Sequence, residues 1–272
     1  MKKILIIIGL IIISLFLYGK YIEINNLKVN EYTIYNENIS DSFKELKLVH
    51  FSDILYKKET NKDYLKDLIK KINEQNPDIV VFSGDLFFKE EKYNDDDIKF
   101  LKELLNDINS TLFKFAVIGD NDKNYLDKYK DILYESEFIL LDNENKLVFY
   151  KDITPINVIG VSNTSDVESL LESDTPYNYT LAITHEPDNL KELNNYKIDT
   201  ILSGHSLGGI INIPYYGGII TEDGANTYVN DYYKLNNTEI YISNGIGNKK
   251  FEFRLFNTPS INVYRFDNKK ES

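Results

Sequence analysis

Five apolar runs along this chain each end in a short polar block, and this arrangement constrains the fold more than any other feature. The blocks are, in chain order, Ser52-Asp53-Ile54-Leu55, Gly84-Asp85, Gly119-Asp120-Asn121-Asp122, Thr184-His185-Glu186-Pro187 and Gly204-His205-Ser206-Leu207-Gly208-Gly209. Each run has the length and β-branched content of a buried strand. We therefore expect the blocks to converge at strand ends, where side chains from separate strands can build one metal site.

Strand-like and helix-like patterns alternate through most of the chain. The predicted strands are 47–52, 79–83, 113–118, 138–141, 157–161, 180–184 and 200–203. Apolar residues at helical spacing predict helices over 61–75 and 96–108, and Pro77 follows the first of them. The alternation favours an α/β fold with mostly buried sheets. Beyond His205, turn-forming residues separate strands such as 239–243 and 260–266, which is typical of antiparallel hairpins.

The N-terminal segment, residues 1–24, predicts a membrane anchor. Lys2 and Lys3 precede an apolar stretch that runs from Ile4 to Gly19. No small-x-small cleavage pattern ends this stretch, so a retained signal anchor is favoured over a cleaved signal peptide. The stretch is shorter than the ~20 residues that span a bilayer, but Lys20 can extend its ammonium group to the interface and let residues 21–24 complete the span.

The charges beside the apolar stretch predict the orientation of the anchor. The positive-inside rule places its N-terminal end in the cytoplasm and the globular domain outside the cell membrane. A buried N-terminal helix is the alternative, and it is disfavoured because residues 4–17 are apolar on all sides rather than along one stripe. We divide the chain into this anchor, a connecting segment (25–44), one domain (45–268) and a short tail (269–272).

Composition limits the partners of the domain. The chain of 272 residues has a formal net charge of -12, which argues against nucleic acid because phosphate neutralisation needs clustered Lys and Arg. A small phosphorylated ligand held through a metal, or a protein partner, remains compatible with this charge. The absence of cysteine excludes disulfides and thiolate metal sites.

The order and content of the five blocks resemble the calcineurin-like metallophosphoesterase superfamily, and the apolar N-terminus resembles its bacterial membrane-anchored type. The family pattern runs Asp-x-His, Gly-Asp, Gly-Asn-His-Asp/Glu, a lone His and Gly-His-x-His. The resemblance extends from Glu45 to Phe266, and the segment 240–247 with Arg254 and Pro259 is similar to the closing strands of bacterial members. It implies a two-sheet α/β/β/α sandwich and metal-dependent phosphoester hydrolysis.

The resemblance also implies two metal sites that share the carboxylate of Asp85. The positions that correspond to the ligands of the first metal are Asp53, Leu55 and Leu207. Those that correspond to the second are Asp120, His185 and His205. For Asp85, the alternative is an aspartate that only caps the following turn.

The chain departs from this pattern where the chemistry is most demanding. Leucines at 55 and 207 stand where the first metal would have imidazoles, so we expect one divalent transition metal, Mn, Zn or Fe, and no second one. The third histidine of the chain, His50, lies three residues before Asp53, and strand alternation points it to the opposite face. We therefore expect His50 to be an ordinary core residue.

The position of the family's proton-donating histidine is also changed. Asn121 stands there, and an amide can donate a hydrogen bond but cannot give up a proton. Asp122, which by the resemblance would orient that histidine, is expected to cap the helix that starts near Asn124. Two functions are consistent with these replacements: a pseudophosphatase that binds a ligand or partner, and a metal-dependent phosphoesterase that uses a variant site.

Overall fold

The computed structural model describes residues 1–213, 216–219, 221, 223–249 and 251–269. Within these residues, one six-stranded sheet has the order β1-β14-β2-β3-β4-β5. Strands β2 to β5 are parallel, β14 is antiparallel to β2, and β1 is parallel to β14. The strands are β1 (Lys28–Tyr35), β2 (Lys47–Phe51), β3 (Ile79–Phe82), β4 (Phe113–Ala116), β5 (Phe138–Leu140) and β14 (Ser260–Asp267).

The second six-stranded sheet of the described chain has the order β12-β13-β9-β8-β7-β6. Its four central strands are parallel, and the edge strands β6 and β12 are antiparallel to their neighbours. The strands are β6 (Glu144–Val148), β7 (Ile156–Val161), β8 (Tyr179–Thr184), β9 (Thr200–Ser203), β12 (Tyr232–Leu235) and β13 (Thr238–Ile242). A small separate hairpin is formed by β10 (Asn212–Ile213) and β11 (Gly217–Gly218).

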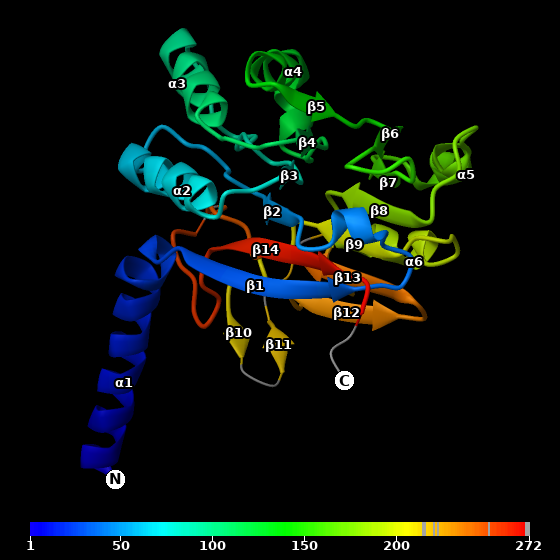
Figure 1. The fold of residues 1–272 in the computed structure, drawn as a ribbon. Coiled ribbons are helices and arrows are strands. Elements are labelled where there is room, and N and C mark those ends of the chain that lie inside the picture. The colour runs from blue at the N-terminus through cyan, green and yellow to red at the C-terminus, as the bar shows by residue number, and fades with distance from the viewer. Residues whose placement is uncertain (214–215, 220, 222, 250, 270–272) are drawn as a thin grey trace.

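Three apolar layers hold these sheets and helices together (Figure 1). Residues such as Leu48 and Leu181 fill the space between the two sheets. The other face of the first sheet packs on helices, and so does the other face of the second sheet. The helices are α2 (Lys62–Glu74), α3 (Asp95–Asn106) and α4 (Leu126–Glu135) on the first sheet, and α5 (Val167–Leu171) and α6 (Leu190–Leu193) on the second. This arrangement confirms the predicted α/β/β/α sandwich.

The two long helices form for the reasons that their sequences suggest. The side chain of Asn61 accepts hydrogen bonds from the first backbone N–H groups of α2, and Asn94 forms a reciprocal capping box with Asp97 at the start of α3. Leu68 and Leu101 are among the apolar residues that each helix buries against the first sheet. Both helices were predicted to within two residues at each end.

Two strands lie where the sequence did not suggest them. Residues 28–35, inside the segment that we assigned to a connection, form β1 and pair along their whole length with β14. The strand β14 in turn leaves the neighbourhood of β13 and joins the first sheet beside β2. Among the described residues after His205, the β12–β13 and β10–β11 pairs are antiparallel hairpins of the predicted kind. Of the predicted tail, residues 270–272 lie outside the described part of the chain.

Helix α1 (Lys2–Tyr21) projects away from both sheets (Figure 1). Together with the turn that follows, it is long and apolar enough to cross a membrane, with a mean hydropathy of 2.3. Its C-terminal end touches the domain. The ring of Phe16 stacks on that of Phe253 with centroids 5.6 Å apart, and Gly19 is buried against the ring of Phe253 and the backbone carbonyl of Arg254.

Candidate metal centre

The polar blocks meet at the carboxyl ends of five strands from both sheets. Strands β2, β3 and β4 lead into Asp53, Asp85 and Asp120, while β8 and β9 lead into His185 and His205. Three of these residues have left-handed backbones, with φ of 53° at Asp53, 63° at Asp85 and 65° at His205. Non-glycine residues adopt this conformation at a cost that the surrounding structure must offset, and such residues cluster at functional sites.

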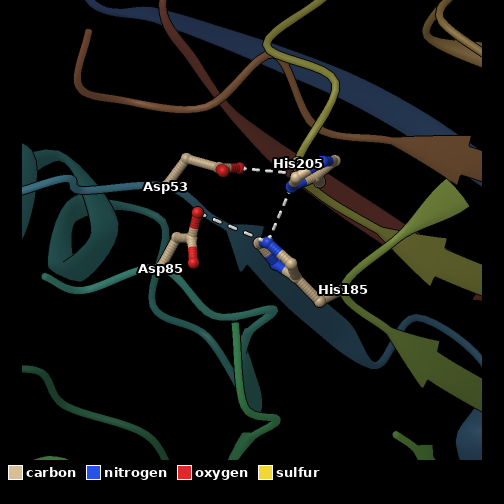
Figure 2. A group of neighbouring side chains, drawn as sticks. All are labelled: Asp53, Asp85, His185 and His205. Atoms are coloured by element: carbon tan, nitrogen blue, oxygen red, sulfur yellow. Dashed lines mark hydrogen bonds and ion pairs between the residues drawn. The ribbon is translucent and has the colours of Figure 1, made fainter. Parts of the chain in front are cut away.

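Four buried side chains form a group that could hold a metal ion (Figure 2). Asp53, Asp85, His185 and His205 each offer one ligand atom, and these four atoms all lie within 4.8 Å of one another. Nε2 of His185 is 3.4 Å from Oδ2 of Asp85 and 3.0 Å from Nδ1 of His205. The backbone N–H of His205 donates to Oδ2 of Asp53 at 2.9 Å.

The second nitrogen of each imidazole is held by a backbone carbonyl. Nδ1 of His185 donates to the carbonyl oxygen of Ser83 at 2.7 Å, and Nε2 of His205 donates to that of Asp223 at 2.6 Å. Carbonyl oxygens only accept, so these contacts fix the tautomers and direct the free lone pair of each ring at the other. This is how histidine ligands are commonly oriented for a metal.

One further atom indicates a missing partner. Oδ1 of Asp53 is buried and has no hydrogen-bond partner among the described residues. A buried carboxylate oxygen without a partner is costly. Two carboxylates and two imidazoles also balance the charge of a divalent cation and are ordinary ligands of Zn, Mn or Fe. The residues present therefore fit one such ion.

The electrostatics of the group are dominated by burial and by the two carboxylates. Burial alone would lower the pKa of His185, but Asp85 and Asp53 outweigh it and raise the pKa to about 10. Burial would raise the pKa of Asp85, but His185 and the backbone N–H of Asn121 lower it to about 2. For Asp53, burial prevails and raises the pKa. The site thus holds Asp85 as a carboxylate, the form that binds cations.

Asp120 lies outside the group of four. Its carboxylate pairs with Nζ of Lys123 at 2.7 Å, and its side chain is 35% exposed. Of the second ligand set that the resemblance implies, the structure therefore brings together Asp85, His185 and His205, and it adds Asp53 instead of Asp120. A ligand role for Asp120 stays a prediction.

Asn121 and Asp122 hold the turn that carries Asp85. The amide of Asn121 donates from Nδ2 to Asp85 Oδ2 at 2.5 Å, and its oxygen accepts from the backbone N–H of Lys89. The carboxylate of Asp122 accepts four backbone N–H bonds, from Asp85, Leu86, Phe87 and Gly119. The interpretation of Asp122 as a helix cap was therefore wrong: its partners are in the loop after β3 and in its own loop, not in the helix.

Next to the metal group lies a small apolar cluster. Leu55 and Leu207 are 1% and 4% exposed, and both pack against Phe88. Both leucines have left-handed backbones, with φ of 47° and 49°. The cluster occupies the positions at which the resemblance implies two imidazoles of the first metal. No pattern in the sequence points to Phe88, because it belongs to none of the five blocks.

His50 lies in the layer between the sheets, as strand alternation predicted. Its ring stacks on Tyr264, and Nε2 contacts Ser83 Oγ at 2.8 Å. Burial lowers its pKa to about 3, so the ring is neutral near pH 7. The metal group does not include it.

His185 of the metal group borders a cavity of about 110 Å³ that the sequence did not indicate. His185, Asp120, Lys123 and Glu186 are among the residues that line it. Burial and the neighbouring Asp120 raise the pKa of Glu186. Glu186 follows the lone histidine directly and was overlooked because the family pattern gives this position no role. The ammonium group of Lys123 and the carboxyl groups of Asp120 and Glu186 thus lie around a cavity beside the metal group.

Comparison with known proteins agrees with this geometry. The sequence profile of the calcineurin-like phosphoesterases matches residues 46–209, which contain all five polar blocks. The chain belongs to the calcineurin-like phosphoesterase family. Members of this family bind divalent metals, and the group formed by Asp53, Asp85, His185 and His205 lies where the matched blocks converge.

Three relatives of this phosphoesterase homologue match over most of their length. The metallophosphoesterase YkuE of Bacillus subtilis is 28% identical over 91% of this chain and 88% of its own. The metallophosphoesterase Cj0846 of Campylobacter jejuni is 30% identical over 97% of this chain and 70% of its own. The UDP-2,3-diacylglucosamine pyrophosphatase LpxG of Chlamydia muridarum is 24% identical over 81% and 83%.

Proposed function

We propose that this protein is a membrane-anchored calcineurin-like phosphoesterase homologue that binds one divalent transition metal and hydrolyses phosphoesters only weakly. The observation that carries the proposal is the apolar cluster of Leu55, Leu207 and Phe88 beside a complete group of four ligands. The ligand is a small phosphorylated molecule or a protein partner. Helix α1 anchors the chain, and the domain lies on the outer side of the cell membrane.

The four ligand side chains would hold the metal, and it would supply Lewis-acid chemistry to a phosphoryl oxygen. The apolar side chains of Leu55, Leu207 and Phe88 lie beside these ligands and have no atom that could bind a second ion. The family's mechanism divides activation of the nucleophile and charge stabilisation between two ions. With one ion, the site is suited to binding a phosphoryl group more than to breaking its ester bond.

Asn121 adds to this limitation. Both ends of its amide are engaged, by Asp85 and by the backbone of Lys89. A leaving alkoxide therefore meets no group at position 121 that can give it a proton, and general-acid help is typically worth ~10²-fold or more. The buried carboxylate of Asp122 is not a substitute, because four backbone N–H groups occupy it.

A second candidate is an efficient phosphoesterase or pyrophosphatase that uses a variant site. Two observations favour it: relatives named UDP-2,3-diacylglucosamine pyrophosphatase, and the cavity in which Asp120 and Glu186 lie beside His185. In this case carboxylate oxygens replace the lost imidazoles as ligands of a second ion.

Metal content and hydrolysis distinguish the two candidates. The full chain is purified in detergent, its metals are counted by elemental analysis, and hydrolysis of a bis-aryl phosphate is measured with Mn added. We expect about one metal per chain and marginal hydrolysis; His205→Ala should remove most of the metal, and Leu55→Ala should retain it. Two tightly held metals, or a rate equal to that of family members with all their histidines, would refute the one-metal proposal and support the second candidate.

A further inference from the structure

We propose that five exposed apolar side chains beside α1 insert into the surface of the bilayer that α1 crosses. They are Phe251 and Phe256 near the C-terminus and Ile213, Tyr216 and Ile219 on or next to the β10–β11 hairpin, and we call them the apolar collar. This inference rests on the membrane anchoring proposed above. The occupant is the lipid interface itself, not a protein.

The collar is a local concentration of exposed apolar surface. Beyond Ile22, the described chain exposes ten large apolar side chains, and five of them belong to the collar. Phe251 is 67% exposed, Tyr216 is 90% exposed and Ile219 is 57% exposed. Soluble surfaces seldom gather such side chains in one region unless the region binds something.

Backbone contacts connect the two parts of the collar. The N–H of Asn212 donates to the carbonyl of Leu255 at 2.9 Å, and the N–H of Leu255 donates to that of Ile210 at 3.1 Å. The hairpin is therefore attached to the segment between Phe251 and Phe256. Figure 1 shows that the hairpin and α1 project from the same side of the domain.

Contacts with α1 set the depth of the collar. Phe253 stacks on Phe16, and the backbone N–H of Arg254 donates to the carbonyl of Gly19 at 3.4 Å. A helix of 20 residues is about 30 Å long, which matches the hydrocarbon core of a bilayer. If α1 spans that core, Phe16 lies about 8 Å inside its outer boundary, measured from Tyr21. Phe253 must then reach the boundary. The backbone N–H of Phe253 donates to the carbonyl of Phe251 at 2.8 Å, and that of Phe256 donates to the carboxylate of Glu23 at 2.9 Å, just beyond the end of α1, so both residues lie close to the boundary.

The charges around the collar are compatible with lipid contact. The carboxylate of Glu252, between Phe251 and Phe253, pairs with Nζ of Lys57 at 2.8 Å. Nζ of Lys20 lies 5.5 Å from the ring of Tyr21, as expected for an ammonium group that reaches the interface beside an aromatic ring. The chain has a formal net charge of -12, so anionic lipid repels it. The collar must therefore bind through apolar burial, which salt does not screen.

The collar is also connected to the loop that carries His205 in the metal centre. Nδ2 of Asn257, next to Phe256, donates to the carbonyl of Leu207 in the loop that carries His205. The backbone N–H of Asn257 donates to the buried carboxylate of Glu23 at 2.7 Å, just beyond α1. The anchor, the collar and the loop of the metal centre thus form one connected unit.

The absence of tryptophan from the chain allows a direct test. Single-tryptophan variants Phe251→Trp and Phe256→Trp of the full chain are reconstituted in neutral phosphatidylcholine vesicles, with and without brominated acyl chains. Ile11→Trp reports insertion of α1. Tyr134→Trp, on α4 and 85% exposed in the native chain, is the matched surface control. We expect the collar reporters to show blue-shifted emission and to lose most of it in brominated lipid at low and high salt, while the Tyr134→Trp reporter keeps its emission.

The reporters separate failure of the collar from failure of the anchor. If the Ile11→Trp reporter is quenched but both collar reporters emit as in water, α1 is anchored and the collar proposal is overturned. If the Ile11→Trp reporter is not quenched, the anchoring proposal itself fails, and the collar fails with it. Equal quenching of the Tyr134→Trp control would also overturn the collar, because lipid contact would then not be confined to that side. An unchanged metal content verifies that each variant is folded.

Discussion

Nδ1 of His205 lies 3.0 Å from Nε2 of His185, and the other nitrogen of each ring is held by a backbone carbonyl. When both rings are neutral, two lone pairs face each other and repel unless a proton or a cation lies between them. In the metal-free protein a proton takes this place, because Asp85 and Asp53 raise the pKa of His185 to about 10 despite its burial. This pair of nitrogens is the centre of the candidate metal site.

Substitution of single carboxylates should separate ligands from neighbours. Asp53→Asn should weaken binding of Mn or Zn by at least about tenfold, because it removes an anionic ligand within 4.8 Å of the other three. Asp120→Asn, in which the altered carboxylate is paired with Lys123, should change the affinity much less. Isothermal titration calorimetry on the full chain in detergent measures both affinities. A larger loss for Asp120→Asn would return Asp120 to the ligand set that the family resemblance implies.

Restoring three imidazoles should rebuild the lost half of the site. The triple variant Leu55→His, Leu207→His and Asn121→His should bind a second metal and gain at least ~10²-fold in hydrolysis of a bis-aryl phosphate, the lower range of general-acid help alone. Each single substitution should raise the rate by less than an additive contribution to this gain, because residues that act as a unit are coupled. The control is the double variant Leu55→Met, Leu207→Met, which keeps the apolar volume. It should bind no second metal and hydrolyse the ester no faster than the wild type.

The same variant should lose stability when no metal is present. Two imidazoles would then be buried beside Phe88 without hydrogen-bond partners, at a cost of about 1–3 kcal/mol for each buried polar group. Thermal unfolding with and without Mn measures the difference. A triple variant as stable without metal as the wild type would show that the apolar cluster does not close around positions 55 and 207.

Loss of the buried carboxylate at Glu23 should loosen the anchor from the domain. Glu23 is 2% exposed and accepts from the backbone N–H groups of Phe256 and Asn257. Glu23→Ala leaves both donors without a partner, which costs about 2 kcal/mol or more. Limited proteolysis should therefore cleave between α1 and β1 faster than in the wild type. Glu31→Ala on β1, where the side chain is 64% exposed, should leave the rate unchanged.

Burial of His50 should make stability fall in acid. The pKa of His50 is about 3 in the folded chain and about 6.5 when unfolded, so the unfolded state binds the proton first as the pH falls. The contribution of His50 to the free energy of unfolding is therefore complete above about pH 6.5. Between about pH 6.5 and pH 3 it falls by about 1.4 kcal/mol for each pH unit. His50→Phe should flatten this part of the dependence in chemical denaturation at pH 4–7. Tyr264→Phe, which alters the ring stacked on His50, is the control that should keep the slope.

Protease added to intact cells tests the proposed orientation. With Lys2 and Lys3 on the cytoplasmic side of α1, the domain lies outside and should be digested without lysis. Protection of the whole domain until the cells are lysed would reverse the orientation. A cytoplasmic protein in the same cells reports whether the membrane stayed closed.

The sequence by itself predicted α1, α2, α3 and most strands of the two sheets, together with the residues at the ends of β2, β3, β4, β8 and β9. This worked because local signals carry that information: β-branched runs, helical spacing and blocks of Gly, Asp and His are all visible within a few residues. The same local signals predicted the core position of His50 from strand alternation. They also predicted the length and the apolar character of α1.

Only the tertiary structure decided which side chains meet. Asp53 joins Asp85, His185 and His205 although they are distant in the chain, while Asp120 turns toward Lys123, because backbone conformation and loop contacts set these directions. Phe88 closes on the two leucines through a contact that no local pattern encodes. Strand β1 was missed although its residues favour a strand. Its partner, β14, follows it by more than two hundred residues, and a pairing at such a separation cannot be read from local patterns.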